Sequence, residues 1–173
     1  MKNLKKNQCF FRGLYIAIAL FISIQLSVAQ PRLPQKTITV IPTQALHFGT
    51  FAVTGGAGGS ITVGYDGSIS SIGNIVPLAT IPTAQPAIFE IKLCQGRNVI
   101  ISYESTTFLT GSEGGSLMLE IGPTEKGVNN ALFMTNSDCN FITPLRVGGT
   151  LNVPGGALSG IYTGSFSIVF NQE

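Results

Sequence analysis

The sequence has no tryptophan, a single histidine and few charged residues, and each of these shortages excludes a kind of site. With His47 as the only histidine, one chain cannot build a histidine-based zinc site. Without tryptophan, a platform of exposed rings that stacks on sugars has less support. Charged residues make up only 10% of the chain, and no basic stretch is long enough to follow a phosphate backbone. We therefore expect no nucleic-acid partner.

Recognisable catalytic and cofactor-binding motifs are also missing. No Gly-x-Ser-x-Gly nucleophile elbow accompanies His47. The glycine-rich residues 55–59 have neither the sixth-position glycine of a dinucleotide loop nor the Lys-Ser/Thr ending of a phosphate loop. Glu90 and Glu120 fall on the polar phase of expected strands, so a solvated face explains them more simply than a glycosidase pair. We expect a protein that is not an enzyme and that has no catalytic residue, cofactor or metal.

The N-terminus has the pattern of an export signal. Residues 1–13 hold four basic residues and no acidic one, and residues 14–28 form an apolar run with three polar interruptions. As a helix this run rises about 22 Å, which is too short for a hydrocarbon core of roughly 30 Å. We therefore expect no membrane span in the mature chain, and a secreted protein of the periplasm, the cell surface or the extracellular medium.

The cleavage site is predicted from the small residues that end the leader. Ser27 and Ala29 occupy the two positions that a signal peptidase reads, which places the cut between Ala29 and Gln30. An uncleaved anchor is the alternative, but Pro31 and Pro34 follow at once and no basic stop-transfer cluster appears.

Removing the leader reverses the sign of the net charge. Four of the ten basic residues lie within residues 1–29, which leaves six basic and eight acidic residues and a formal charge of −2. The mature chain has the length of one ordinary domain. We expect a flexible arm over residues 30–36 and a single domain over residues 37–173.

Two of the three cysteines remain after the leader is removed. An even number of cysteines in an exported chain favours a disulfide, here between Cys94 and Cys139. Two free buried thiols or a metal pair are the alternatives. The bridge would close a loop of about 45 residues, which corresponds to roughly 4 kcal/mol in the chain-entropy model.

Apolar and polar residues alternate with a period of two along the mature chain, which is typical of strands with one buried face. No window of about a dozen residues has a helical stripe. We expect strands at residues 37–41, 60–65, 87–94, 98–103 and 116–121.

The last alternating segment is the most regular. It begins at Gly160 and predicts one long strand whose aromatic face enters the core. The residues on that face are Gly160, Tyr162, Gly164, Phe166, Ile168 and Phe170.

Turn-forming residues separate these segments, and glycine pairs such as Gly148-Gly149 are expected at turns, bulges or edges. Asp66-Gly67 predicts a type I′ hairpin, because both central residues of that turn need positive φ. A two-residue loop would place Tyr65 opposite Ser68 and would leave Ile69 on the other face from Val63. Short strands between such turns predict an antiparallel sandwich or a barrel-like fold.

Four motifs carry a resemblance to a known family. They are Leu46-His47-Phe48-Gly49-Thr50, Asp66-Gly67, Val147-Gly148-Gly149-Thr150-Leu151 and Gly160-Ile161-Tyr162-Thr163-Gly164-Ser165-Phe166. With these residues the chain resembles, from about residue 37 to 171, a family of exported bacterial β-domains of unknown function. The resemblance implies a secreted or surface-located, all-β immunoglobulin-like sandwich, and it supplies no catalytic residues.

The chain also resembles the subunits of fimbriae, more loosely. Phe89-Glu90-Ile91-Lys92-Leu93-Cys94 is similar to their alternating strand that ends in a disulfide cysteine, and Gly160 opens a similar final strand. This resemblance implies a sandwich completed by a strand from another chain. The position of Cys139 after Cys94, and the two prolines of residues 30–36, depart from that pattern.

Three hypotheses about function follow. The first is a non-enzymatic structural or adhesive surface component, fimbria-like, with a protein partner or self-assembly through sheet edges. The second is a secreted module that binds carbohydrate or another ligand through its loops. The third is a secreted hydrolase that uses His47.

Overall fold

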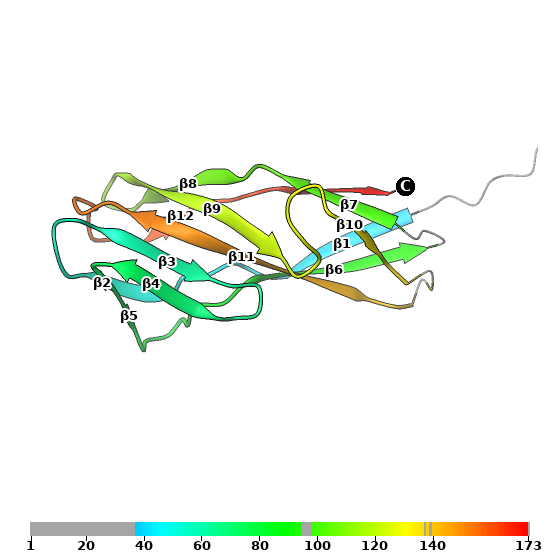
Figure 1. The fold of residues 1–173 in the computed structure, drawn as a ribbon, viewed down its shortest axis with the longest axis horizontal. Coiled ribbons are helices and arrows are strands. Elements are labelled where there is room, and N and C mark those ends of the chain that lie inside the picture. The colour runs from blue at the N-terminus through cyan, green and yellow to red at the C-terminus, as the bar shows by residue number, and fades with distance from the viewer. Residues whose placement is uncertain (1–36, 95–97, 137, 139, 173) are drawn as a thin grey trace, which may run out of the picture. The chain divides into compact units, whose positions relative to one another are not determined.

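The computed structural model of the protein describes residues 37–94, 98–136, 138 and 140–172 (Figure 1). The regular secondary structure of these residues consists of β-strands, and each strand pair is antiparallel. This confirms the prediction of an all-β, antiparallel fold. The strands are β1 (Thr37–Gln44), β2 (Thr50–Val53), β3 (Gly59–Val63), β4 (Ile69–Gly73), β5 (Ile75–Leu78), β6 (Ala87–Cys94), β7 (Asn98–Tyr103), β8 (Thr106–Gly111), β9 (Ser116–Thr124), β10 (Leu132–Met134), β11 (Thr143–Val153), β12 (Tyr162–Thr163) and β13 (Ile168–Gln172).

The alternating segments form strands where the sequence predicts them. β6 and β7 have the predicted bounds, and β1 and β9 begin at the predicted residues and continue three residues further. The expected alternation of side chains is present in β6, where Ala87, Ile91 and Leu93 are buried and the residues between them are more exposed. Period-two patterning is therefore a sufficient signal for these strands.

The strands form three sheets in the described part of the chain. The large sheet follows the order β1-β6-β11-β9-β8-β12, and the β3–β4 hairpin pairs with β11 outside this path. A second sheet has the order β10-β7-β13, and a third consists of β2 and β5. Figure 1 shows β11 running through the large sheet, which makes it the element that connects the other strands.

β11 pairs along both of its edges and changes partner halfway along one of them. Its residues from Thr143 to Val147 pair with β6, and those from Gly149 to Val153 pair with β3. The other edge pairs with β9. β11 is not among the predicted strands, because its Gly148-Gly149 pair is typical of a turn, bulge or edge.

Gly148 lies where the partner changes and where the backbones approach closely. Val147 pairs with Thr124 and Gly149 pairs with Ile121, so Gly148 alone faces two residues of β9, Gly122 and Pro123. Proline has no amide hydrogen to donate to the ladder, and a bulge is one of the few places where a paired strand accepts it. A Cβ on Gly148 would collide with the carbonyl oxygen of Val63 and would lie 2.8 Å from the amide nitrogen of Tyr65. Only glycine fits there without a backbone shift.

The hairpin between β3 and β4 has a different turn from the one predicted. Val63 pairs with Ile69, and the amide of Gly64 donates to Ser68 O at 2.8 Å, so the loop has three residues and not two. Gly67 has a φ of +84°, whereas Asp66 is not among the residues with positive φ, which excludes type I′. The extra residue brings Ile69 opposite Val63, the apolar pair that a two-residue loop would separate.

The Asp66 carboxylate stabilises this loop. Its Oδ1 accepts hydrogen bonds from the Ser68 hydroxyl at 2.6 Å and from the Ser68 amide at 3.0 Å. These bonds favour the ionised carboxylate, so they hold the pKa of Asp66 below its ordinary value. The Asp66 carboxylate therefore has its hydrogen-bond partners within its own turn.

The prediction of one long final strand is wrong. The segment forms two short strands in two different sheets, because β12 pairs with β8 and β13 pairs with β7. Side-chain burial still alternates, with Phe166, Ile168 and Phe170 half-buried against the core and Ser167 and Val169 exposed. The alternation reports which face is buried and does not report which strand lies alongside.

The large sheet and the β10-β7-β13 sheet pack on one shared hydrophobic core. β7 contributes buried residues from the smaller sheet, and β3, β6, β9 and β11 contribute them from the larger one. The side chains that are almost fully buried are Ile61, Val63, Ile91, Leu93, Val99, Ile101, Leu117, Leu145 and Val147. Burial of apolar surface at this interface is the main favourable contribution to stability.

We predict that Gly148→Ala lowers the free energy of unfolding by about 1–3 kcal/mol, because the new methyl group displaces the backbone at Val63 and Tyr65. Urea unfolding followed by circular dichroism measures this change. Gly56→Ala is the matched control, since nothing lies within 4 Å of a Cβ at that position. Equal stability of the two variants would contradict the proposed role of Gly148.

Candidate functional site

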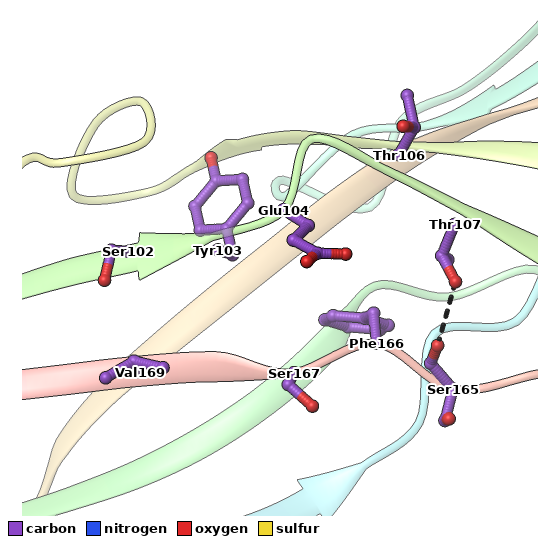
Figure 2. A pocket seen from close by; sticks show the side chains of 9 residues that line it. All are labelled: Ser102, Tyr103, Glu104, Thr106, Thr107, Ser165, Phe166, Ser167 and Val169. Carbon is purple, nitrogen blue, oxygen red and sulfur yellow. Dashed lines mark hydrogen bonds between the residues drawn. The ribbon is translucent and has the colours of Figure 1, made fainter.

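A groove lies where the chain crosses between the two larger sheets. It has a volume of about 470 Å³ and is lined by the end of β7, the start of β8 and the segment between β12 and β13 (Figure 2). Most of its lining side chains carry hydroxyl groups. The lining residues are Ser102, Tyr103, Glu104, Thr106, Thr107, Ser165, Phe166, Ser167 and Val169.

The groove exists because two paired segments have unequal lengths. Tyr103 pairs with Ile168 in one sheet and Thr110 pairs with Thr163 in the other. Between these pairs, residues 104–109 face residues 164–167, so one segment is two residues longer than the other. A regular ladder cannot continue across that difference, and the strands separate.

The backbone of residues 164–167 is left with few partners by this separation. Outside the strand ladders of the described residues, none of its amides or carbonyls makes a backbone–backbone hydrogen bond. The Thr107 hydroxyl donates to Ser165 O at 3.2 Å, which ties the segment to β8 at one point (Figure 2). The other backbone groups of the segment are available to water or to a ligand.

Tyr103 and Glu104 give the groove a neutral wall and a charged wall. The Tyr103 hydroxyl donates to Gly122 O at 3.1 Å, and burial raises its pKa above the ordinary value, so the phenol stays protonated. Figure 2 shows the exposed Glu104 carboxylate directed toward the Phe166 ring. Hydroxyls, one carboxylate and one aromatic ring suit a neutral polyhydroxyl ligand or an extended backbone.

Phe166 also belongs to a cluster of three rings beneath the final strand. The centroid of Phe89 on β6 lies 6.4 Å from that of Phe166 and 6.2 Å from that of Phe170, in edge-on and tilted arrangements. Such geometry is favourable for aromatic pairs. Because β6 is the neighbour of β1, these contacts place β13 over the β1 side of the large sheet.

The edges of the sheets on this side have no partner strand among the described residues. β1 pairs only with β6, and β13 pairs only with β7. The inward residues of both strands, and Phe166 just before β13, are half-buried, although they pack against the core. These residues are Ile38, Val40, Phe166, Ile168 and Phe170. Together with Phe89 they form what we call the open seam, defined by these six residues.

His47 lies away from the groove and has a structural role in a turn. Its backbone pairs with Gln85, and its Nδ1 accepts a hydrogen bond from the Gly49 amide at 2.8 Å. Within residues 37–94, 98–136, 138 and 140–172, no group of three or more His, Cys, Asp or Glu side chains could hold a metal ion.

The two predicted cysteine partners are only partly within the described structure. Cys94 ends β6 opposite Thr37, whereas Cys139 lies outside the described residues. β11 begins at Thr143, which pairs with Ile91, so the chain enters β11 at the end of the sheet where β6 reaches Cys94. The disulfide stays a prediction.

The other predicted positions are distributed as follows. Ala29 and Gln30, the predicted cleavage site, lie outside the described residues. Gly160 precedes β12, and Gly164 lies between β12 and β13, close to Phe108 and Leu109 of β8. Among the described residues there is no helix long and apolar enough to cross a membrane.

Fold and groove define an antiparallel β-domain with free sheet edges and a polar groove at its last strand. The model of one protein family, DUF4402, a domain of unknown function, matches residues 38–171. The chain belongs to this family, which confirms the resemblance to a domain family of unknown function. No curated protein and no solved structure matches the chain.

We predict that the exported chain contains a Cys94–Cys139 disulfide. Its intact mass should increase by two hydrogens on reduction, and Cys94→Ser should lower the free energy of unfolding by up to about 4 kcal/mol. Free thiols in the exported, unreduced protein, titrated under denaturing conditions, would contradict the pairing. Reduced wild type serves as the control, because it should have the stability of the variant.

Proposed function

We propose that the protein is an exported, non-enzymatic structural or adhesive component of a cell surface, fimbria-like, that acts through the free edges of an immunoglobulin-like sandwich. The leader pattern of residues 1–29 supports export. The antiparallel fold supports a sandwich, since the two larger sheets share one core. The protein would then reside in the periplasm, on the cell surface or outside the cell.

The open seam is the observation that carries this proposal. Its apolar side chains are half-buried at the margin of the core, so an added strand beside β13 would remove further apolar surface from water. The same strand would supply hydrogen-bond partners for the outer edge of β13. Burial and backbone pairing at one place are the two contributions on which strand addition depends.

β13 also lacks the features that usually block edge pairing. Its sequence is Ile168-Val169-Phe170-Asn171-Gln172, with neither proline nor a charged residue. Natural proteins commonly place lysine or proline on an edge strand to prevent association. The absence of lysine and proline from the β13 edge supports a role in assembly.

Substitution of Val169 tests the proposal. Val169 lies on β13 and is 52% exposed, and Val128 lies in the turn between β9 and β10, outside β13, and is 67% exposed. In the exported full chain, we expect assemblies larger than dimers that grow with concentration. Val169→Lys should raise the concentration for half-assembly by about tenfold or more, whereas Val128→Lys should not. Sedimentation velocity and negative-stain electron microscopy measure both.

A chain that stays monomeric or dimeric at every concentration would contradict assembly through β13. Equal effects of Val169→Lys and Val128→Lys would contradict it as well, because both add one lysine to the surface. Circular dichroism of each variant establishes that the fold is retained.

The groove supports a second candidate function, binding of a carbohydrate. Six of its nine lining residues are Ser, Thr or Glu, and the Phe166 ring lines the same groove. Hydroxyls and a carboxylate can exchange hydrogen bonds with sugar hydroxyls, while the ring contacts the apolar face of a sugar.

We predict that, if a glycan binds, Glu104→Gln weakens binding by about tenfold, since a charge-assisted hydrogen bond is lost. Glu113→Gln is the matched control, because Glu113 is equally a surface carboxylate but lies in the turn between β8 and β9, outside the groove. A glycan array identifies the ligand, and titration calorimetry measures the affinities. An array without any signal above background would remove this candidate.

A further inference from the structure

β4 is the most exposed strand of the large sheet. All five of its residues, Ile69-Ser70-Ser71-Ile72-Gly73, are exposed, and in the described structure β4 pairs with β3 alone. Ile72 is 71% exposed. The strand therefore presents an unpaired backbone edge and two large apolar side chains to solvent.

The apolar surface continues from β4 onto β5. Ile69 of β4 and Pro77 and Leu78 of β5 line one pocket of about 280 Å³, with Phe48 among its other lining residues. Leu78 and Val76 of β5 are also exposed. Ile69 and Ile72 lie three residues apart on one strand, so they flank its unpaired edge from opposite sides. We call this edge, with the exposed apolar residues Ile69, Ile72, Val76, Pro77 and Leu78, the β4 face.

The β4 face lies in a part of the chain that is almost free of charge. From residue 37 to residue 89, Asp66 is the only acidic or basic residue, apart from the single histidine, His47. The Asp66 carboxylate is already hydrogen-bonded within its own turn by Ser68. A partner that meets the β4 face therefore finds no charge with which to pair.

The absence of charge restricts what the partner can be. A charged surface placed against the β4 face would lose its hydration without gaining a counter-ion, which is unfavourable. The partner must instead be uncharged and must offer an unpaired strand edge. Both properties are present in the β4 face itself.

A second β4 edge is also complementary in geometry. Two identical strands can pair antiparallel about a two-fold axis, so that each supplies the donors and acceptors that the other lacks. The edges of β1 and β5 are less suitable for such pairing, because β1 contains Pro42 and β5 contains Pro77. β4 contains neither proline nor a charged residue.

We propose that the β4 face binds the β4 face of a second copy of this chain, which joins the two large sheets across a two-fold axis. The partner of this free edge is thus a second copy of the chain, and the proposal rests on the proposed function of the protein as an assembling component. It uses a different strand and a different sheet from the β13 contact, so either can exist without the other.

Substitution of Ile72 tests the dimer. Ile72→Lys places a charge in the centre of the contact, where it would be desolvated twice, once in each copy. Ile161→Lys is the matched control, because Ile161 is 73% exposed and precedes β12, outside the β4 face. In sedimentation velocity of the exported full chain, we expect a dimer whose dissociation constant rises at least about tenfold in Ile72→Lys and is unchanged in Ile161→Lys.

Hydrogen exchange supplies a second measurement that does not need a variant. The amides of residues 69–73 should become more protected as the protein concentration rises through the dimer range, whereas the β8–β9 turn near Glu113 should not. A monomeric wild type, equal effects of the two lysine variants, or exchange of β4 that is independent of concentration would overturn the inference. Binding of the β4 face to neutral phosphatidylcholine vesicles in place of a dimer would also overturn it.

The two proposals have distinguishable failures. Large assemblies that Val169→Lys disrupts and Ile72→Lys leaves intact would support the proposed function and exclude the β4 dimer. A dimer that Ile72→Lys disrupts, without any larger assembly, would support the β4 contact and exclude assembly through β13.

Discussion

Because β11 hydrogen-bonds along both of its edges, it fixes the positions of three other strands at once. Its first half holds β6, its second half holds β3, and its opposite edge holds β9. These three strands in turn carry β1, β4 and β8. The change of partner from β6 to β3 requires the backbone near Val63 to approach β11 closely, and the missing side chain of Gly148 makes that approach sterically allowed. The free edges of β1 and β4 both depend on this one crossing.

The sequence predicts strands well where a face alternates without interruption, and less well where glycine or a partner change intervenes. β6 and β7 have the expected bounds. β11 carries the same signal, since Leu145, Val147, Leu151 and Val153 are all buried on one face. It was missed because a glycine pair was interpreted as a break, when here it is a close contact inside the strand. A burial pattern that resumes in phase after a glycine pair would have identified it.

Features that depend on two strands at once could not be predicted from one segment. The final segment has the burial alternation of one strand, but its partner changes from β8 to β7. The groove arises from a two-residue difference between opposing segments, which is a property of their register. Likewise, the hairpin loop has one residue more than predicted because Val63 pairs with Ile69, although Val63 is buried and Ile69 is exposed. The register of the two strands thus decided a turn that local propensity alone assigned to another type.

The two unblocked edges differ in the kind of contact that each can make. A two-fold contact between identical β4 edges closes on itself and stops at two copies. β13 lies over an apolar seam that is part of its own core, so the strand that completes it must bring apolar side chains in a matching register. The outer edge of β13 is therefore suited to a different segment from itself, and a contact of that kind leaves a further edge free on the next copy. Two edges of these two kinds, on separate sheets of one domain, would allow β4 dimers to be connected through β13 into longer assemblies. With the β13 edge blocked, only a pair would form, and with the β4 edge blocked, only a single row of copies.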